Sequence, residues 1–368
     1  MKPILFNFTD AELEKFVTDM GLPRFRAKQI REWLQRGAPN FSVMKNLPED
    51  LRKKLDETAQ TLPVKIVQKL ESNDNQTTKF LLELNDCEQI ECVLMRTTYG
   101  NSVCVSSQAG CAMGCKFCAS TLLGLKRNLT INEMYAQILI CQWELRGDRL
   151  DDTKKEIRPN GDPNNNDVSH IVVMGTGEPL QNTENVIGFL ERANSELNIS
   201  WRRITVSTCG IIPGIEALNA WRRPINLAIS LHAPTDDLRA QIMPINNRYK
   251  LADVLDAAFR FSETHNRQLM IEYILLGKKN NNGETELFNA TPEHAEKLSD
   301  LMRGHNVMVN LIPWNAVDER DFASISGNAV HRFQDILIKN GVHTRIRRER
   351  GADIGSACGQ LRLKNAKK

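Results

Sequence analysis

Several of the nine cysteines in this chain stand in one short segment, "VCVSSQAGCAMGCKFCAS", as Cys104, Cys111, Cys115 and Cys118. A structural zinc site normally needs four ligands, and a second pair would have to come from cysteines scattered elsewhere in the chain. A thioredoxin-like redox pair needs only Cys115 and Cys118, which leaves Cys111 without a role. An iron–sulfur cluster is held by closely spaced thiolates on a loop, and a 4Fe-4S cube with three cysteine ligands keeps one iron open for a small molecule. The Cys-x3-Cys-x2-Cys spacing favours this last interpretation.

A second stretch with chemical potential is "GTGEPL", which contains Gly175, Gly177 and Glu178. It lacks the third glycine of a dinucleotide-binding fingerprint, so taken alone it also fits a tight turn. Further polar or site-forming residues follow apolar runs downstream, namely Ser207, Ser230, Leu231, His232 and Asn315. Because functional groups of parallel α/β folds collect where strands end, we expect these residues to share one site.

The elements that would position these residues are strands alternating with helices. The strand candidates are "SVCVSS" (102–107), "HIVVMG" (170–175), "ITVST" (204–208), "INLAISL" (225–231), "LMIEYILL" (269–276) and "VMVNLI" (307–312). Helical patterns lie between them, for example at 131–145 and 254–265. Continuous apolar strands that alternate with helices predict a parallel α/β sheet with the helices outside. Six such units predict a partial (βα)6 barrel or an open, curved sheet rather than a closed eight-fold barrel.

The first sixty residues predict helices instead. Thr9 and Glu12 fit a capping box at the start of the first helix. A second helix begins after Pro23 and stops at Gly37, and its many basic residues form either a solvated face or a surface for phosphates. A third helix is expected around "EDLRKKLDET".

The chain is therefore expected to have three parts. Residues 1–62 form a helical accessory domain, and residues 63–97, whose apolar period changes to two, form a short antiparallel β linker. Residues 98–368 form the main α/β domain. The polar stretches 146–167 and 277–294 are expected to be exposed insertions or loops.

Composition limits the class of protein but not its partner. The 368 residues are 41% hydrophobic and 25% charged, with a net charge of +3, which argues neither for nor against nucleic acid. The N-terminus lacks the apolar region of a secretory signal, and no run reaches the ~20 apolar residues of a membrane span. We expect a soluble cytoplasmic protein in a reducing compartment, where clustered cysteines more often mean metal or catalysis than disulfides.

The cysteine motif together with "GTGEP" resembles the radical SAM superfamily. The stretches "CVSSQAGCAMGCKFC", "GLKRNLT", "VMGTGEPL", "SLHAPTDDLR", "MPINNRY", "NLIPWN" and "SACGQL" are together similar to the RlmN family of RNA adenine methyltransferases, over about residues 5–363. The resemblance implies methylation of C2 of an adenine in 23S rRNA and of the adenine beside the tRNA anticodon. The same group includes Cfr-type enzymes, which methylate C8. Pro313 and Trp314 resemble the C2 branch.

The resemblance also implies a role for individual residues. Cys111, Cys115 and Cys118 would ligate one 4Fe-4S cluster. S-adenosyl-L-methionine would be bound by Gly177, Glu178, Ser207, Ser230, Leu231, His232 and Asn315. Cys358 would carry a methyl group as a thioether, Cys104 would resolve the protein–RNA adduct through a transient disulfide with Cys358, and Glu91 would accept a proton. Without the family, these last three would be an incidental thiol, a small buried side chain and an ordinary strand carboxylate.

The implied reaction uses two S-adenosylmethionine molecules. One methylates Cys358, and the other yields a 5′-deoxyadenosyl radical that activates the S-methyl group for addition to C2, a carbon that base-assisted methylation cannot reach. The implied partners are 23S rRNA, tRNA and a flavodoxin- or ferredoxin-type reductant, with no membrane and a monomeric chain. The alternatives are a Cfr-type C8 methyltransferase and, from another class, a non-catalytic protein that binds zinc or RNA.

Overall fold

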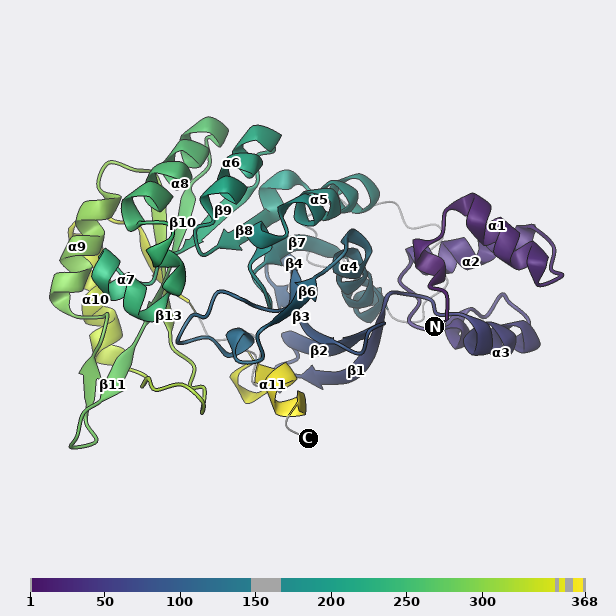
Figure 1. The fold of residues 1–368 in the computed structure, drawn as a ribbon, viewed down its shortest axis with the longest axis horizontal. Coiled ribbons are helices and arrows are strands. Elements are labelled where there is room, and N and C mark those ends of the chain that lie inside the picture. Colours follow the sequence, from purple (N-terminus) through teal and green to yellow (C-terminus); the bar gives the residue numbers. More distant parts are fainter. Residues whose placement is uncertain (1, 147–166, 348–350, 355–359, 367–368) are drawn as a thin grey trace.

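One continuous sheet organises the chain (Figure 1). The computed structural model describes residues 2–146, 167–347, 351–354 and 360–366. In these residues the sheet has ten strands in the order β1-β2-β3-β4-β7-β8-β9-β10-β13-β14. The N-terminal helices lie at one end of the molecule, and α9 and α10 lie at the other (Figure 1).

The N-terminal helices are α1 (Asp10–Asp19), α2 (Phe25–Gln35) and α3 (Glu49–Thr58), with 3-10 turns η1 (Leu5–Asn7) and η2 (Phe41–Val43). The predicted capping box is confirmed, because the Glu12 amide donates to Thr9 Oγ1 at 3.3 Å and the Thr9 amide donates to Glu12 Oε2 at 2.7 Å. These bonds satisfy amide donors that the first turn of a helix would otherwise leave open.

The next three strands are antiparallel, as the period of two predicts. They are β1 (Val64–Glu71), β2 (Thr77–Leu84) and β3 (Gln89–Thr97). β3 then pairs antiparallel with β4 (Gly100–Cys104), so this meander extends the edge of the main sheet.

From β4 onward the strands are parallel and form an open partial barrel. They are β4, β7 (Val168–Val173), β8 (Ile204–Thr208), β9 (Asn226–Ser230), β10 (Leu269–Leu275), β13 (Val307–Pro313) and β14 (Thr344–Ile346). The six predicted strands are all present, which confirms the α/β class. β14 was not predicted because its sequence, "TRI", is short and polar.

The longer helices cover the outer face of this sheet (Figure 1). They are α4 (Ile131–Arg146), α5 (Thr183–Leu197), α6 (Ile212–Trp221), α8 (Leu251–His265), α9 (Pro292–Met302) and α10 (Gly327–Lys339). Shorter helices in the connections are α7 (Asp236–Ile242), α11 (Gln360–Ala366), η3 (Ala119–Thr121), η5 (Pro179–Gln181), η6 (Trp201–Arg203), η7 (Pro244–Asn247) and η8 (Ala352–Ile354).

Two small hairpins leave the main sheet. β5 (Gln108–Gly110) pairs with β6 (Leu125–Asn128), and β11 (Gly277–Lys279) pairs with β12 (Thr285–Leu287). The second hairpin falls in the stretch 277–294, which was expected to be an exposed insertion. Its β12 strand is exposed, whereas Asn289 just beyond it is buried. Most of the other polar stretch, 146–167, lies outside the described residues.

The N-terminal helices share one apolar core with the barrel. The rings of Trp33 and Trp143 lie 6.2 Å apart, and those of Phe6 and Tyr135 lie 6.1 Å apart, so this unit packs on α4. Among the residues that the structure describes, no helix combines the length and the apolar character that a membrane crossing needs.

Candidate active site

The three closely spaced cysteines lie in a loop framed by the β5–β6 hairpin. Cys111 and Cys115 are buried, and Cys118 is partly exposed. Gly114, between the first two, has φ of +69°, a conformation that suits glycine and lets the loop turn sharply. The Thr121 hydroxyl donates to the Cys118 carbonyl at 3.1 Å, which closes the end of the loop.

The thiols of this loop interact with one another. Burial raises the pKa of Cys111 to about 12, and Cys118 and Glu178 add to this increase although a backbone hydrogen bond near Met113 opposes it. Burial is also the main cause of the strongly raised pKa of Cys115, followed by the charges of Cys118 and Cys111. Metal ligation would reverse this preference, because a bound cation deprotonates its thiol ligands. Three adjacent sulfur donors on a buried loop therefore fit the donor set of an iron–sulfur cluster.

Two side-chain hydrogen bonds and a cluster of apolar side chains hold the cysteine loop in place. Trp314, which follows β13, donates from Nε1 to the Phe117 carbonyl at 3.2 Å. Arg320 donates from Nη2 to the Cys118 carbonyl at 2.6 Å. Trp314 and Val317, both from the segment after β13, are buried in the same apolar cluster as Cys111 and Cys115, so this segment shields these two cysteines from solvent. Among the described residues, no set of three His, Cys, Asp or Glu side chains is arranged to hold a single metal ion.

The "GTGEP" stretch follows β7 and packs closely on its neighbours. A Cβ on Gly175 would lie 2.8 Å from the backbone of Val105, and one on Gly177, whose φ is +111°, would lie 2.6 Å from Gln108 Cβ. Gln108 Oε1 in turn accepts from the Glu178 amide at 2.8 Å. Neither position has room for a side chain, so both must be glycine. The spacing of the glycines in the sequence could not distinguish this close packing from an ordinary tight turn.

The Glu178 carboxylate is bonded within the protein. Its Oε1 accepts from Thr208 Oγ1 at 2.7 Å, and its Oε2 accepts from the Cys209 amide at 2.8 Å. Burial raises the pKa of Glu178 although these hydrogen bonds work against the increase. Glu178 therefore ties the glycine loop to the end of β8.

Polar side chains at the ends of two neighbouring strands lie side by side. Ser207 on β8 and Ser230 on β9 have hydroxyl oxygens 3.5 Å apart. Ser230 is directly opposite Glu272 on β10, which is opposite Asn310 on β13, and Asn310 Nδ2 donates to Glu272 Oε2 at 2.8 Å. The structure thus brings Ser207 and Ser230 together and adds Glu272, whose pKa is raised chiefly by burial. The sequence analysis did not single out Glu272, although it is the one carboxylate in the apolar run "LMIEYILL".

Leu231 and His232 continue from β9. The Leu231 amide donates to the Glu272 carbonyl at 3.1 Å. His232 is buried with φ of +60°, and its Nδ1 accepts from the Ile274 amide at 3.0 Å. Burial, assisted by Arg239, lowers the pKa of His232 to about 3, so its ring is neutral and serves packing and hydrogen bonding rather than proton transfer.

Asn315 follows the end of β13 and is partly exposed. The neighbouring Ala316 carbonyl accepts from Gln360 Nε2, at the start of α11, at 2.9 Å. The C-terminal helix thus contacts the strand end that was predicted to bind the cofactor.

Glu91 and Cys104 share one face of the sheet. Val93 is directly opposite both Lys79 and Cys104, and Glu91 lies two positions from Val93, so these side chains alternate onto the same face. Glu91 is buried, with Oε2 2.8 Å from Lys79 Nζ and Oε1 accepting from the Arg362 amide at 2.7 Å.

Helix α11 lies beside this face (Figure 1). Arg362 Nη2 donates to Glu88 Oε2 at 3.0 Å, and Asn365 Nδ2 donates to Gln89 Oε1 at 2.8 Å. α11 also contacts η3, the turn that begins directly after Cys118. Cys358 itself lies outside the described residues.

Three buried cysteines have no proposed role in the reaction: two lie on the outer face of the sheet and one lies beside the cysteine loop. Cys92 and Cys141 are buried on the outer face of the sheet with sulfurs 3.5 Å apart, as expected for packing residues. Cys209 packs with Cys111 and Cys115, which places it beside the candidate site.

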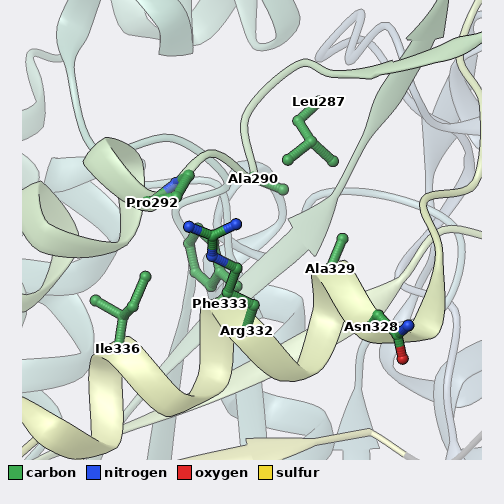
Figure 2. Close-up of a pocket in the computed structure, with 8 residues that line it drawn as sticks. All are labelled: Leu287, Ala290, Pro292, Asn328, Ala329, Arg332, Phe333 and Ile336. Atoms are coloured by element: carbon green, nitrogen blue, oxygen red, sulfur yellow. The ribbon is translucent and has the colours of Figure 1, made fainter.

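A hollow of about 220 Å³ lies elsewhere, against α10 (Figure 2). It is lined by Leu287, Ala290, Pro292, Asn328, Ala329, Arg332, Phe333 and Ile336. Its lining includes no residue of the candidate site, so this hollow is a separate surface feature.

Comparison with known proteins agrees with this geometry. The family model described as "Ribosomal RNA large subunit methyltransferase N-terminal domain" matches residues 4–61, and "Radical SAM superfamily" matches residues 105–290. The chain is 43% identical to "Probable dual-specificity RNA methyltransferase RlmN" of Alkaliphilus oremlandii over 98% of both chains. It is 44% identical to the protein of that name in Lachnoclostridium phytofermentans, over 95% of this chain and 92% of the relative. A radical SAM methyltransferase from Sphaerobacter thermophilus is similar in structure, with a TM-score of 0.79 and 36% identity over 97% of this chain and 98% of the other.

Proposed function

Because the chain belongs to the RlmN family of radical SAM RNA methyltransferases, we propose that it methylates C2 of an adenine in 23S rRNA. We propose the same chemistry at the adenine beside the tRNA anticodon. The observation that supports this best is the common face of Glu91 and Cys104, which lies beside α11 and near the cysteine loop.

In the proposed site, Cys111, Cys115 and Cys118 hold one 4Fe-4S cluster. Gly177, Glu178, Ser207, Ser230, Leu231, His232 and Asn315 surround S-adenosylmethionine. When bound, the two groups supply a 5′-deoxyadenosyl radical. The protein's task is to orient them and to keep water out, which fits the buried cysteines and the anchors Trp314 and Arg320.

Three residues are proposed to handle the transferred carbon. Cys358 carries the methyl group, Cys104 attacks the Cys358 sulfur to release the product with formation of a disulfide, and Glu91 accepts the C2 proton. Lys79 and the Arg362 amide hold both oxygens of the Glu91 carboxylate. These contacts fix the position of the carboxylate beside Cys104, which a positioned acceptor of protons requires.

The parts of the chain outside the barrel are proposed to serve the substrate. Residues 1–62 form an RNA-binding domain, residues 63–97 a β extension, and residues 98–368 the catalytic unit. A flavodoxin- or ferredoxin-type protein donates electrons, and the enzyme acts as a monomer in the cytoplasm.

The deciding experiment is nucleoside analysis after reaction. Protein reconstituted anaerobically is incubated with a 23S rRNA fragment or tRNA, S-adenosylmethionine and dithionite, and the digested RNA is compared by mass spectrometry with 2- and 8-methyladenosine standards. We expect about four irons per chain, as one cube requires, and 2-methyladenosine in both RNAs. Formation of 8-methyladenosine would show the Cfr-type alternative, and a colourless zinc-loaded protein would contradict the proposal.

The two proposed catalytic cysteines are tested separately. Cys358→Ala should keep its iron but form no methylated adenosine, and Cys104→Ala should accumulate protein covalently attached to RNA. Cys87→Ala is the matched control, because Cys87 is exposed in the turn before β3. Normal turnover by Cys358→Ala or by Cys104→Ala would refute the corresponding role.

A further inference from the structure

Arg239 on α7 is a fully buried arginine close to the candidate site. Burying a charged side chain costs several kcal/mol unless other groups compensate. Its Nε donates to the Leu231 carbonyl at 3.2 Å, its Nη1 to Asn246 Oδ1 at 3.0 Å and its Nη2 to the Cys209 carbonyl at 2.7 Å. All three acceptors are uncharged. Among the described residues, none of its hydrogen-bond acceptors is a carboxylate, and the Asp236 carboxylate acts on it from beyond Asn246, whose Nδ2 donates to Asp236 Oδ1 at 2.8 Å.

Two of the acceptors of Arg239, the carbonyls of Cys209 and Leu231, belong to the two strand ends that are proposed to bind S-adenosylmethionine. Cys209 directly follows β8, and Leu231 directly follows β9. Nη2 also lies 3.4 Å from the Ser230 carbonyl. A planar guanidinium presents its donors in a fixed fork, so it can hold several carbonyl groups at once, which an ammonium cannot do.

The charge of Arg239 also faces the cysteine loop. Cys209, whose carbonyl it binds, packs with Cys111 and Cys115. The Lys116 amide, inside the cysteine loop, donates to the carbonyl of Ile242, the last residue of α7, at 2.9 Å, so the helix that carries Arg239 contacts this loop directly. Net charge around a cluster is one of the determinants of its reduction potential. A cube held by three thiolates is anionic and becomes more so on reduction, so a buried cation beside it stabilises the reduced form.

We propose that Arg239 is a positioning residue with two effects: its fork fixes the ends of β8 and β9 for S-adenosylmethionine, and its charge offsets that of the reduced cluster. This inference rests on the proposed function, because it requires the cluster at Cys111, Cys115 and Cys118. It assigns a use to a buried charge whose hydrogen-bond acceptors among the described residues are all uncharged.

The test separates geometry from charge with two substitutions. Arg239→Lys keeps the charge but loses the fork, and Arg239→Gln loses the charge. Arg260→Gln is the matched control, because Arg260 is an exposed arginine paired with Glu216. Anaerobically reconstituted protein is assayed for iron content, for the cluster's midpoint potential by EPR during dithionite titration, and for the dissociation constant of S-adenosylmethionine by equilibrium dialysis.

We expect Arg239→Lys to bind S-adenosylmethionine about tenfold more weakly, because the strand ends lose hydrogen bonds that hold them in place and the loss of one such bond corresponds to about a tenfold change. Its midpoint potential should stay near that of the wild type. Arg239→Gln should weaken binding and also lower the potential. Arg260→Gln should change neither. Wild-type affinity and potential in an iron-loaded Arg239→Gln protein would overturn the inference, whereas a wild-type protein that takes up no iron would overturn the proposed function instead.

A milder variant covers the case in which Arg239→Gln does not fold. Asp236, at the start of α7, is partly exposed, and its negative charge acts on Arg239. Asp236→Asn keeps an oxygen that can accept from the Leu251 amide, now 2.9 Å from Asp236 Oδ1, and removes the charge. The midpoint potential should therefore rise. An unchanged potential in this variant, together with unchanged affinity in Arg239→Lys, would also overturn the inference.

Discussion

Burial sets the protonation state of individual side chains at this site, and His232 is the clearest example. Its Nδ1 accepts from the Ile274 amide, and its ring meets Phe117 edge to face with centroids 4.8 Å apart. A proton on Nδ1 would break that hydrogen bond and place a charge in an apolar site beside Arg239. This explains why the pKa of His232 falls to about 3.

The lowered pKa makes stability depend on pH. The unfolded chain binds a proton near pH 6.5 and the folded chain only near pH 3, so the unfolding free energy should fall as pH drops through this window and be unaffected above it. His232→Asn tolerates the positive φ and keeps an acceptor, but it does not titrate. We expect it to cost about 1–2 kcal/mol at pH 7 and to lose part of the acid dependence. Urea unfolding of the cluster-free protein at pH 7 and pH 5 tests this; identical pH dependence in both proteins would contradict it.

The Lys79–Glu91 pair shows how a buried ion pair depends on both partners. Both side chains are almost completely buried. We expect Lys79→Met to destabilise the protein by about 3–5 kcal/mol, because it leaves a buried carboxylate without its cation, and Lys79→Met/Glu91→Gln to recover much of this loss.

Lys69→Met is the control for this pair. Lys69 lies on the neighbouring strand β1 and bonds Glu144 with 40% of its own side chain exposed, so its removal should cost less than about 1 kcal/mol. The four unfolding free energies are measured in urea. Equal losses for Lys79→Met and Lys69→Met would show that burial of the first pair has no consequence.

Among the elements, the β5–β6 hairpin frames the cysteine loop through a very close approach of two glycines. A Cβ on Gly110, whose φ is +89°, would lie 1.9 Å from the Gly124 carbonyl oxygen. Gly124 has φ of +65°, but a Cβ there would meet nothing within 4 Å. Alanine should cause backbone strain of roughly 1–2 kcal/mol at either position, whereas only Gly110→Ala also forces the strands apart.

We therefore expect Gly110→Ala to lose most of its iron after reconstitution and Gly124→Ala to keep it. The iron-to-protein ratio, measured together with circular dichroism to confirm folding, distinguishes the two. Equal iron content in the two folded variants would show that the hairpin does not set the geometry of the loop.

The same elements show what sequence patterns can and cannot predict. The capping box at Thr9, the six apolar strands and the polar strand ends follow from local spacing, and the structure confirms the elements and the meeting of Ser207 with Ser230. The β5–β6 hairpin was not predicted because its strands have only three and four residues. Lys79 and Arg239 were missed because their partners are set by sheet register and by loops distant in sequence, neither of which leaves a local signal.

For the molecule as a whole, the decisive feature is the joint between the N-terminal helices and the barrel. α2 ends near Gly37, which lies directly against the backbone of α4. α4 then connects β6 to the sheet whose inner face holds Glu91 and Cys104. If residues 1–62 bind RNA as proposed, a rigid joint holds that RNA at a constant distance from the proposed site. Loosening the joint should then weaken RNA binding and slow methylation but leave the cluster and the binding of S-adenosylmethionine unchanged.

Gly37→Ala tests this separation. A Cβ at Gly37, whose φ is +82°, would lie 2.5 Å from the Leu139 carbonyl oxygen, whereas one at Gly21, with φ of +77°, would meet nothing within 4 Å. Backbone strain is therefore common to both alanine variants, and the clash with α4 belongs to Gly37→Ala alone, with an additional cost of about 1–3 kcal/mol. We expect Gly37→Ala to bind the rRNA fragment more weakly and to methylate it more slowly, while its iron content and its affinity for S-adenosylmethionine match those of Gly21→Ala. If the two variants bind RNA equally well, the position of the N-terminal helices on α4 does not govern substrate binding. If Gly37→Ala also loses iron, the joint supports the catalytic unit itself.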